Sequence, residues 1–335
     1  MPIEWAPLVD FLRTHERPLL MTHVRPDADG LGSQLALHDA LLRLGKHSRV
    51  AIASKLPPRY EFLDPKREVI EDFRPATASN FADRDCVLVM DTGTFNQLGD
   101  FGDYLKANPV PRAVLDHHRT QDDLGGHRYV DIESESCGRL SYELIRHLGI
   151  EPSPAAANHL FMAVATDTGW FRHPNAVPAT FSLAAELVRL GAKPTELYEK
   201  LYEAAPLARL KLTGVAIDRL KVRLGGRIAY TEILLADYAA TGAVPGDTED
   251  LINFPRSVEG VEAALVFIEQ PGNGTKVSFR SKSLDVSKLA EGFGGGGHKL
   301  ASGARTDKPL AITREEVLQA VEAAMTTPPG AASHS

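Results

Sequence analysis

Short apolar runs alternate with helix-like stretches over the first 190 residues. Mostly apolar runs that predict strands lie at 19–21, 48–53, 86–90 and 111–115. Between and after them, apolar residues recur at helical spacing over 33–44, 138–148 and 154–165. Parallel strands need long crossover connections, so strands separated by helices predict a parallel sheet flanked by helices. We therefore expect an α/β fold.

The pattern changes near residue 215. Short β-type runs follow at 221–224, 227–233, 263–268 and 276–280, and a last helix is expected over 314–324. Gly225-Gly226 and the segment 271–274 have the turn chemistry that hairpins require. We expect a large domain over 1–190, a helical connector over 191–214, a smaller α/β domain over 215–326 and a tail over 327–335.

The composition is that of an ordinary globular protein. The chain has 335 residues, a hydrophobic fraction of 43% and a charged fraction of 24%. A formal net charge of -7 argues against a protein that coats nucleic acid nonspecifically, because such binding neutralises many phosphates with Lys and Arg. No strongly basic face that would bind long DNA is evident either. A small phosphorylated ligand in a local basic pocket remains compatible with this charge.

Cysteine usage and the N-terminus add further expectations. Cys86 and Cys137 are too few and too far apart for a disulfide framework or a thiolate zinc site. No signal-peptide pattern and no apolar stretch long enough to span a bilayer is evident. The expectation is a cytoplasmic protein with no membrane partner.

Polar side chains follow several of the predicted strands and one helix. They are His23, Asp27 and Asp29 after the first strand, Asp91 after the third, Asp116, His117 and His118 after the fourth, and Asp167 at the end of a helix. The carboxyl ends of parallel strands lie at one edge of a sheet, where open α/β sheets bind their ligands. Carboxylate and imidazole without thiolate suit Mn²⁺, and less specifically Fe²⁺, Mg²⁺ or Zn²⁺. Two adjacent ions of this kind are a standard device for hydrolysing phosphoesters.

In this order, these residues closely resemble the four motifs of the DHH phosphoesterases, which are named after the triplet at Asp116. The resemblance implies two bound divalent ions, with Mn²⁺ as our first expectation, and two ligand sets that share Asp91 as a bridge. The sets are His23, Asp27 and Asp91 for one ion, and Asp29, Asp91, His117 and Asp167 for the other. His118 resembles the residue that contacts the scissile phosphate or assists proton transfer. Asp116 is expected to orient the histidines.

A second candidate site is the glycine run 294–297 followed by His298, with Arg280 upstream. Successive glycines can leave backbone N–H groups open to an anion, and Arg can clamp phosphate oxygens. The glycines alone are equally compatible with a flexible linker. The run also resembles the signature of the small domain that accompanies DHH domains. That likeness implies that Arg280, Gly295, Gly296, Gly297 and His298 hold the phosphate and sugar of the substrate.

The sequence thus predicts a phosphoesterase with its active site in the cleft between two domains. By resemblance, the substrates are short oligoribonucleotides, released as mononucleotides, and 3′-phosphoadenosine 5′-phosphate (pAp), released as AMP and phosphate, after attack by a hydroxide that two metals activate. Within the same family, the alternative is a phosphodiesterase of cyclic or linear dinucleotides. From another class, the alternative is a nucleotide-binding sensor without catalysis, from which some of the proposed ligands would be expected to be missing. A homodimer is a reasonable expectation for such an enzyme.

Overall fold

The computed structural model describes residues 3–326, except for the side chain of His298. The chain divides into two compact units, and the division falls between Ala204 and Ala205. The predicted domain boundaries at 190 and 214 lie on either side of this point, and the predicted tail over 327–335 lies outside the described residues. Among residues 3–326, no helix is both long and apolar enough to cross a membrane.

The N-terminal unit contains a parallel six-stranded sheet in the order β3-β2-β1-β4-β5-β6. Its strands are β1 (Pro18–Thr22), β2 (Arg49–Ile52), β3 (Ile70–Asp72), β4 (Cys86–Met90), β5 (Arg112–Asp116) and β6 (His127–Val130). Its helices are α1 (Ala6–Thr14), α2 (Ala28–Arg43), α3 (Phe95–Leu98), α4 (Asp100–Ala107), α5 (Cys137–His147), α6 (Pro154–Asp167), α7 (Pro178–Arg189) and α8 (Pro194–Tyr198). Short 3₁₀ segments η1 (Pro58–Leu63) and η2 (Pro75–Phe81) and a π-helical turn η3 (Glu199–Glu203) complete it. The predicted α/β class is confirmed.

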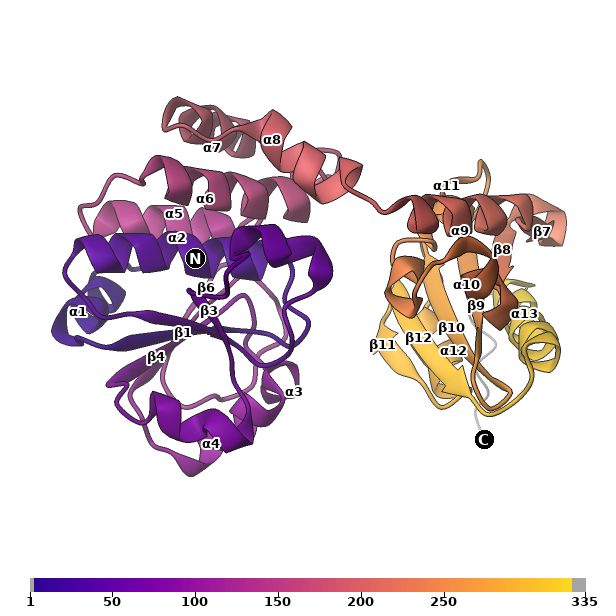
Figure 1. Cartoon of the computed structure of the whole chain (residues 1–335), viewed down its shortest axis with the longest axis horizontal. Helices are drawn as coiled ribbons and strands as arrows, with labels where there is room; N and C mark the ends of the chain where they lie inside the picture. The colour runs from indigo at the N-terminus through magenta and orange to yellow at the C-terminus, as the bar shows by residue number, and fades with distance from the viewer. Residues whose placement is uncertain (1–2, 327–335) are drawn as a thin grey trace. The chain divides into compact units, whose positions relative to one another are not determined.

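Helices cover both faces of this sheet, as Figure 1 shows: α2, α5 and α6 lie on one face, and α3 and α4 on the other. Successive strand residues point to opposite faces, so Leu20 and Leu88 join one core while Leu19 and Met21 join the other. A strand buried on both sides has no polar alternation, which explains the continuous apolar runs in the sequence.

Helix α2 begins earlier than the sequence predicts. The apolar spacing predicts a start at Ser33, whereas the helix begins at Ala28. Asp27 is its N-cap, and its carboxylate accepts hydrogen bonds from the backbone N–H groups of Asp29 and Gly30. Such a cap satisfies donors that the first helical turn leaves free. Asp29 therefore lies in the first turn of a helix rather than in a loop.

The C-terminal unit contains a mixed sheet in the order β11-β12-β10-β9-β8-β7. Its strands are β7 (Lys221–Arg223), β8 (Ile228–Ile233), β9 (Ala263–Gln270), β10 (Gly274–Ser281), β11 (Gly296–His298) and β12 (Ala301–Thr306). Its helices are α9 (Leu207–Asp218), α10 (Leu235–Thr241), α11 (Asn253–Ser257), α12 (Val286–Glu291) and α13 (Leu310–Thr326), with 3₁₀ turns η4 (Leu224–Gly226) and η5 (Pro245–Thr248).

The predicted hairpins of this unit are confirmed. Strand β7 pairs antiparallel with β8 around Gly225-Gly226, and β9 pairs antiparallel with β10 around the turn 271–274. Strands β8 and β9 are parallel to each other. Apolar residues fill both faces of the sheet, since Phe279 packs in one core and Ala264 in the other.

Candidate metal centre

The candidate residues gather where the strand order of the N-terminal sheet reverses. His23, Asp91 and His117 are each the first residue after a strand, following β1, β4 and β5 respectively. These strands are neighbours in the sheet. The chain runs outward in both directions from β1 and β4, and open α/β sheets bind ligands at such a reversal.

Helices supply the remaining acids. Asp27 and Asp29 stand at the start of α2, and Asp167 is the last residue of α6. The Asp29 carboxylate accepts the backbone N–H groups of Cys137 and Gly138, each at 2.8 Å, at the start of α5. The sequence gives no sign of these two amide contacts, because any residue type can supply them.

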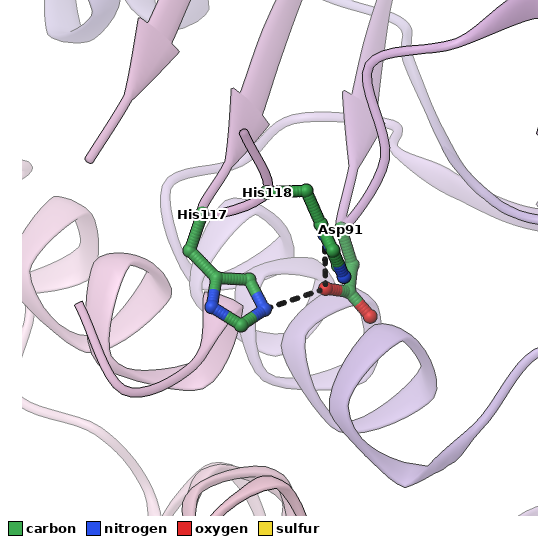
Figure 2. Close-up of side chains that lie close together, drawn as sticks. All are labelled: Asp91, His117 and His118. Atoms are coloured by element: carbon green, nitrogen blue, oxygen red, sulfur yellow. Dashed lines mark ion pairs between the residues drawn. The ribbon is translucent and has the colours of Figure 1, made fainter. Parts of the chain in front are cut away.

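The side chains form two groups that share Asp91. His23 Nε2 lies 3.5 Å from Asp91 Oδ2 and 3.7 Å from Asp27 Oδ1. His117 Nε2 lies 3.4 Å from Asp91 Oδ1, 3.5 Å from Asp29 Oδ2 and 3.9 Å from Asp167 Oδ2. One oxygen of Asp91 thus faces each group, and Figure 2 shows His117 and His118 converging on Oδ1. The structure brings all six predicted ligands together; their ligand roles stay predictions.

The tautomers of both histidines suit a metal. The Nδ1 atom of His23 lies 3.0 Å from the carbonyl oxygen of Val24, and that of His117 lies 3.2 Å from the carbonyl oxygen of Ser134. A carbonyl oxygen only accepts, so each Nδ1 carries the donated proton, and each Nε2 is the atom that can offer a lone pair once a metal displaces its proton. Among the described residues, the buried Asp91 Oδ1 and His117 Nε2 atoms have no hydrogen-bond partner. Buried polar atoms without partners are costly, and a bound cation would satisfy both.

The electrostatics also favour positive charge. Burial, followed by the charges of Asp91 and Asp167, raises the pKa of Asp29 well above its usual value. Burial and neighbouring acids likewise raise the pKa of Asp167 to about 6, although His117 opposes this. Burial lowers the pKa of His23, but hydrogen bonding and charge from Asp27 and Asp91 outweigh it and raise the value to about 11. Without a metal, the site concentrates carboxylates and retains protons; divalent cations would relieve both conditions.

The backbone around Asp91 fits its central position. Asp91 has a left-handed φ of 61°, which an L residue adopts at a cost, and its N–H donates to the Leu115 carbonyl of β5. Gly30 of α2 lies against Thr22 and Asp91. A Cβ at Gly30 would lie 2.4 Å from Thr22 Oγ1 and 3.3 Å from Asp91 Oδ2. The absence of a side chain at Gly30 lets the helix start approach the carboxylate closely.

Asp116 holds His118 by a network that ends at Gln121. The buried Asp116 Oδ1 accepts the backbone N–H groups of His117 and His118 and lies 2.8 Å from His118 Nδ1. Its Oδ2 accepts Gln121 Nε2. Burial raises the pKa of Asp116, but the hydrogen bonds and charge of His118 outweigh it and hold the pKa below its usual value. Gln121 was not among the predicted site residues, and its only signal in the sequence is its place three residues after His118.

The glycine-rich segment of the C-terminal unit forms an ordered hairpin. Strand β11 pairs with β12, so that His298 is opposite Ala301, and Ala301 is also opposite Arg280 of β10. The backbone of His298 therefore shares a cross-strand row with Arg280; its side chain lies outside the described part of the structure. Burial, followed by the charge of Arg256, lowers the pKa of the partly buried Arg280.

The amides of this segment differ from the expectation. The N–H groups of Gly294 and Gly295 donate to the carbonyls of Glu291 and Ala290 and close the end of α12. The prediction of amides open to an anion is therefore wrong for these two residues. At Gly296, in contrast, a Cβ would meet nothing within 4 Å. Open space beside Gly296 is compatible with close approach of a ligand.

Comparisons with known proteins agree with this geometry. Residues 18–205 match the N-terminal domain of the DHH family, and residues 225–327 match the DHHA1 domain. A Thermus thermophilus protein named "Bifunctional oligoribonuclease and PAP phosphatase NrnA" is 31% identical over 95% of this chain and 94% of its own length. The Bacillus subtilis protein of the same name is 27% identical, over 89% of this chain and 91% of its own.

Solved structures show the same fold. An exopolyphosphatase-related protein from Bacteroides fragilis superposes with a TM-score of 0.86 at 23% identity, over 95% of this chain and 94% of that one. Exonuclease RecJ bound to manganese superposes with a TM-score of 0.58 at 19% identity, over 98% and 96% of the two chains. The family predicted from the motifs is confirmed: the chain belongs to the DHH family and carries a DHHA1 domain.

Proposed function

We propose that this chain hydrolyses phosphoester bonds in short oligoribonucleotides and in pAp with the help of two divalent cations. The observation that carries the proposal is the convergence of six histidine and aspartate side chains, with Asp91 at their centre. Three sets of nearby acids and imidazoles that could hold an ion occur there. The names of the relatives, oligoribonuclease and PAP phosphatase, support the choice of substrates.

The chain's own residues divide into two ligand groups. His23 and Asp27 would hold one ion, and Asp29, His117 and Asp167 the other, with Asp91 contributing one oxygen to each. Two bound divalent ions acidify a water molecule and neutralise charge that develops on the phosphate. The buried amide contacts of Asp29 fix its orientation before any ion binds.

His118 lies beside this centre with a different role. Its Nδ1 is occupied by Asp116, and its side chain is 55% exposed. Nε2 is therefore the atom left to contact a phosphate oxygen or to move a proton to the leaving oxygen. Asp116 and Gln121 keep the ring in this orientation, as outer residues commonly do for metal-site histidines.

In the C-terminal unit, Arg280, Gly295, Gly296, Gly297 and His298 are proposed to bind the phosphate and sugar of the substrate. The backbones of Arg280 and His298 share one row across the sheet, and the space beside Gly296 is open. The Gly295 amide is already used by α12, so its contribution would be shape rather than hydrogen bonding.

One assay panel tests the proposal. The purified full chain is given pAp, a 5′-phosphorylated trinucleotide or cyclic di-AMP, each with Mn²⁺, Mg²⁺ or EDTA. We expect AMP and phosphate from pAp, mononucleotides from the trinucleotide, and no product in EDTA. Turnover of cyclic di-AMP alone would replace the proposal with the dinucleotide alternative, and tight binding without any product would favour a sensor. The preference for Mn²⁺, the cytoplasmic location and the homodimer stay predictions.

A further inference from the structure

The metal centre lies at the carboxyl ends of β1, β4 and β5. The carboxyl ends of β2 and β3 extend this rim of the sheet beyond β1. The parallel register pairs Thr22, the end of β1, with Ile52, the end of β2, and Ile52 with Asp72, the end of β3. All three strands therefore end at the same level. Neighbouring strands are about 4.8 Å apart, so the residues that follow β2 lie within one nucleotide's reach of those that follow β1.

Arg25 links the metal centre to this continuation. It stands midway between the candidate ligands His23 and Asp27, with a left-handed φ of 53°. Its backbone N–H donates to the hydroxyl of Ser54, 2.7 Å away, in the loop after β2. A strained backbone held by a hydrogen bond from another segment indicates a fixed local conformation. The loop of the metal centre is thereby joined to the segment that contains Lys55.

Arg25 and Lys55 are cations without a counterion. Both side chains are exposed, and neither forms an ion pair with any residue that the structure describes. The other arginines near the ends of β2 and β3 are paired: Arg67 and Arg74 both contact Asp72. Two free cations at neighbouring strand ends, beside a phosphoesterase centre, suit a second phosphate group.

A cavity adjoins Lys55. It has a volume of about 560 Å³, and its walls include the apolar residues Leu56, Phe62 and Pro65. Its charged lining residues are Lys55, Glu61, Asp64, Arg67 and Asp72, of which Arg67 and Asp72 pair with each other. This size falls in the range of small-molecule sites, and a ring and aliphatic surfaces beside polar groups suit a nucleoside. Asp64 in its wall already accepts the backbone N–H groups of residues 68–70, so that carboxylate is satisfied.

We propose that this region is a subsite for the second nucleotide of an oligoribonucleotide. Arg25 and Lys55 bind the phosphodiester that follows the scissile one, and the cavity accepts the attached nucleoside. pAp has no second nucleotide, so the subsite favours oligoribonucleotides over pAp. The inference rests on the proposed function.

Charge-neutral variants test the phosphate contacts. We expect Arg25→Gln and Lys55→Gln each to lower the ratio of kcat/KM for a 5′-phosphorylated trinucleotide to kcat/KM for pAp by about tenfold. The matched control is Arg17→Gln, which removes a half-exposed cation at the opposite edge of the sheet, where it pairs with Asp83. The control should leave the ratio unchanged. An unchanged ratio in both test variants would overturn the subsite, whereas failure of the wild type to cleave either substrate would overturn the proposed function instead.

Binding without turnover gives an independent readout. A fluorescent 5′-phosphorylated trinucleotide is titrated with the full chain in EDTA at several salt concentrations. Each lost phosphate contact should reduce the slope of log K against log salt by about 0.7. We expect that reduction in Arg25→Gln and Lys55→Gln but not in Arg17→Gln. An abasic middle residue should weaken wild-type binding; equal affinity for the abasic and intact trinucleotides would contradict a nucleoside in the cavity.

Discussion

The metal centre of the N-terminal unit and the glycine-rich hairpin of the C-terminal unit are built in opposite ways. In the first, side chains do the chemistry: six candidate ligands converge, and hydrogen bonds to the backbone orient His23, His117 and Asp29. In the second, the backbone makes the surface, and the absence of side chains is the main feature. A side-chain site should depend sharply on each group, whereas a backbone site should depend on shape.

The largest effect is expected at Asp91. Replacing it in Asp91→Asn should lower kcat/KM by about 10³-fold, because both ligand groups lose a charged oxygen. In EDTA the Asp91 charge acts in two opposed ways: it raises the pKa of Asp29 and Asp167, which destabilises the folded chain, and it raises the pKa of His23, which stabilises it. Thermal unfolding of the variant in EDTA should therefore change little. Steady-state kinetics and thermal unfolding measure the two effects.

Asp10→Asn is the matched control for this change, because Asp10 is an exposed acid on α1. It should alter neither quantity. If Asp91→Asn kept the turnover of the wild type, a carboxylate shared by two ions could not be required at this position.

A smaller effect is expected at Gln121, which contacts Asp116 rather than a candidate metal ligand. Gln121→Leu leaves Asp116 Oδ2 without its side-chain donor, so His118 should lose its fixed orientation. We expect kcat to fall by about 10-fold to 100-fold, with KM changed less, as is usual for residues that orient metal-site groups. If kcat stayed at the wild-type value, the orienting network would extend no further than Asp116.

The C-terminal unit should respond in affinity rather than turnover. Arg280→Lys keeps the charge but loses the planar fork, so KM for pAp should rise by about tenfold while kcat changes little. Arg305→Lys, near the far end of β12, is the matched control and should behave as the wild type. A loss confined to kcat in Arg280→Lys would place Arg280 among the reacting groups instead.

Adjacent glycines give the finest test of a backbone site. A Cβ at Gly295 would lie 2.1 Å from the Gly303 carbonyl oxygen, whereas one at Gly296 would meet nothing within 4 Å. Gly295→Ala should therefore destabilise the chain by about 1–3 kcal/mol. Gly296→Ala should keep full stability and bind pAp several-fold more weakly in EDTA. If Gly296→Ala bound pAp as tightly as the wild type, the hairpin would have a structural role only and no role in binding.

The same contrast explains which strands and which site residues could be predicted from the sequence. Strands β1, β4 and β5 are buried runs that end on a polar residue, so both the strands and the site residues after them could be predicted. Strands β3 and β6 were not predicted: each lies at an edge of the sheet, β3 has three residues, and half of β6 is exposed. Such edge strands are stabilised by pairing with one neighbouring strand, so their own hydrophobic pattern does not predict them.

Several contacts that fix the site were missed because apolar spacing does not reveal them. The start of α2 depends on the Asp27 cap rather than on apolar spacing, and the orientation of His117 depends on the Ser134 carbonyl. In the glycine run, a sequence of identical residues could not show which amides close α12 and which position is open.

The most direct test of the account is the location and number of bound ions. Crystals of the full chain grown with Mn²⁺ should give two anomalous peaks in the N-terminal unit, one beside His23, Asp27 and Asp91, the other beside Asp29, Asp91, His117 and Asp167. Asp91 should contact both. A single peak, or two peaks that do not share Asp91, would contradict the two-ion centre on which the proposed hydrolysis depends.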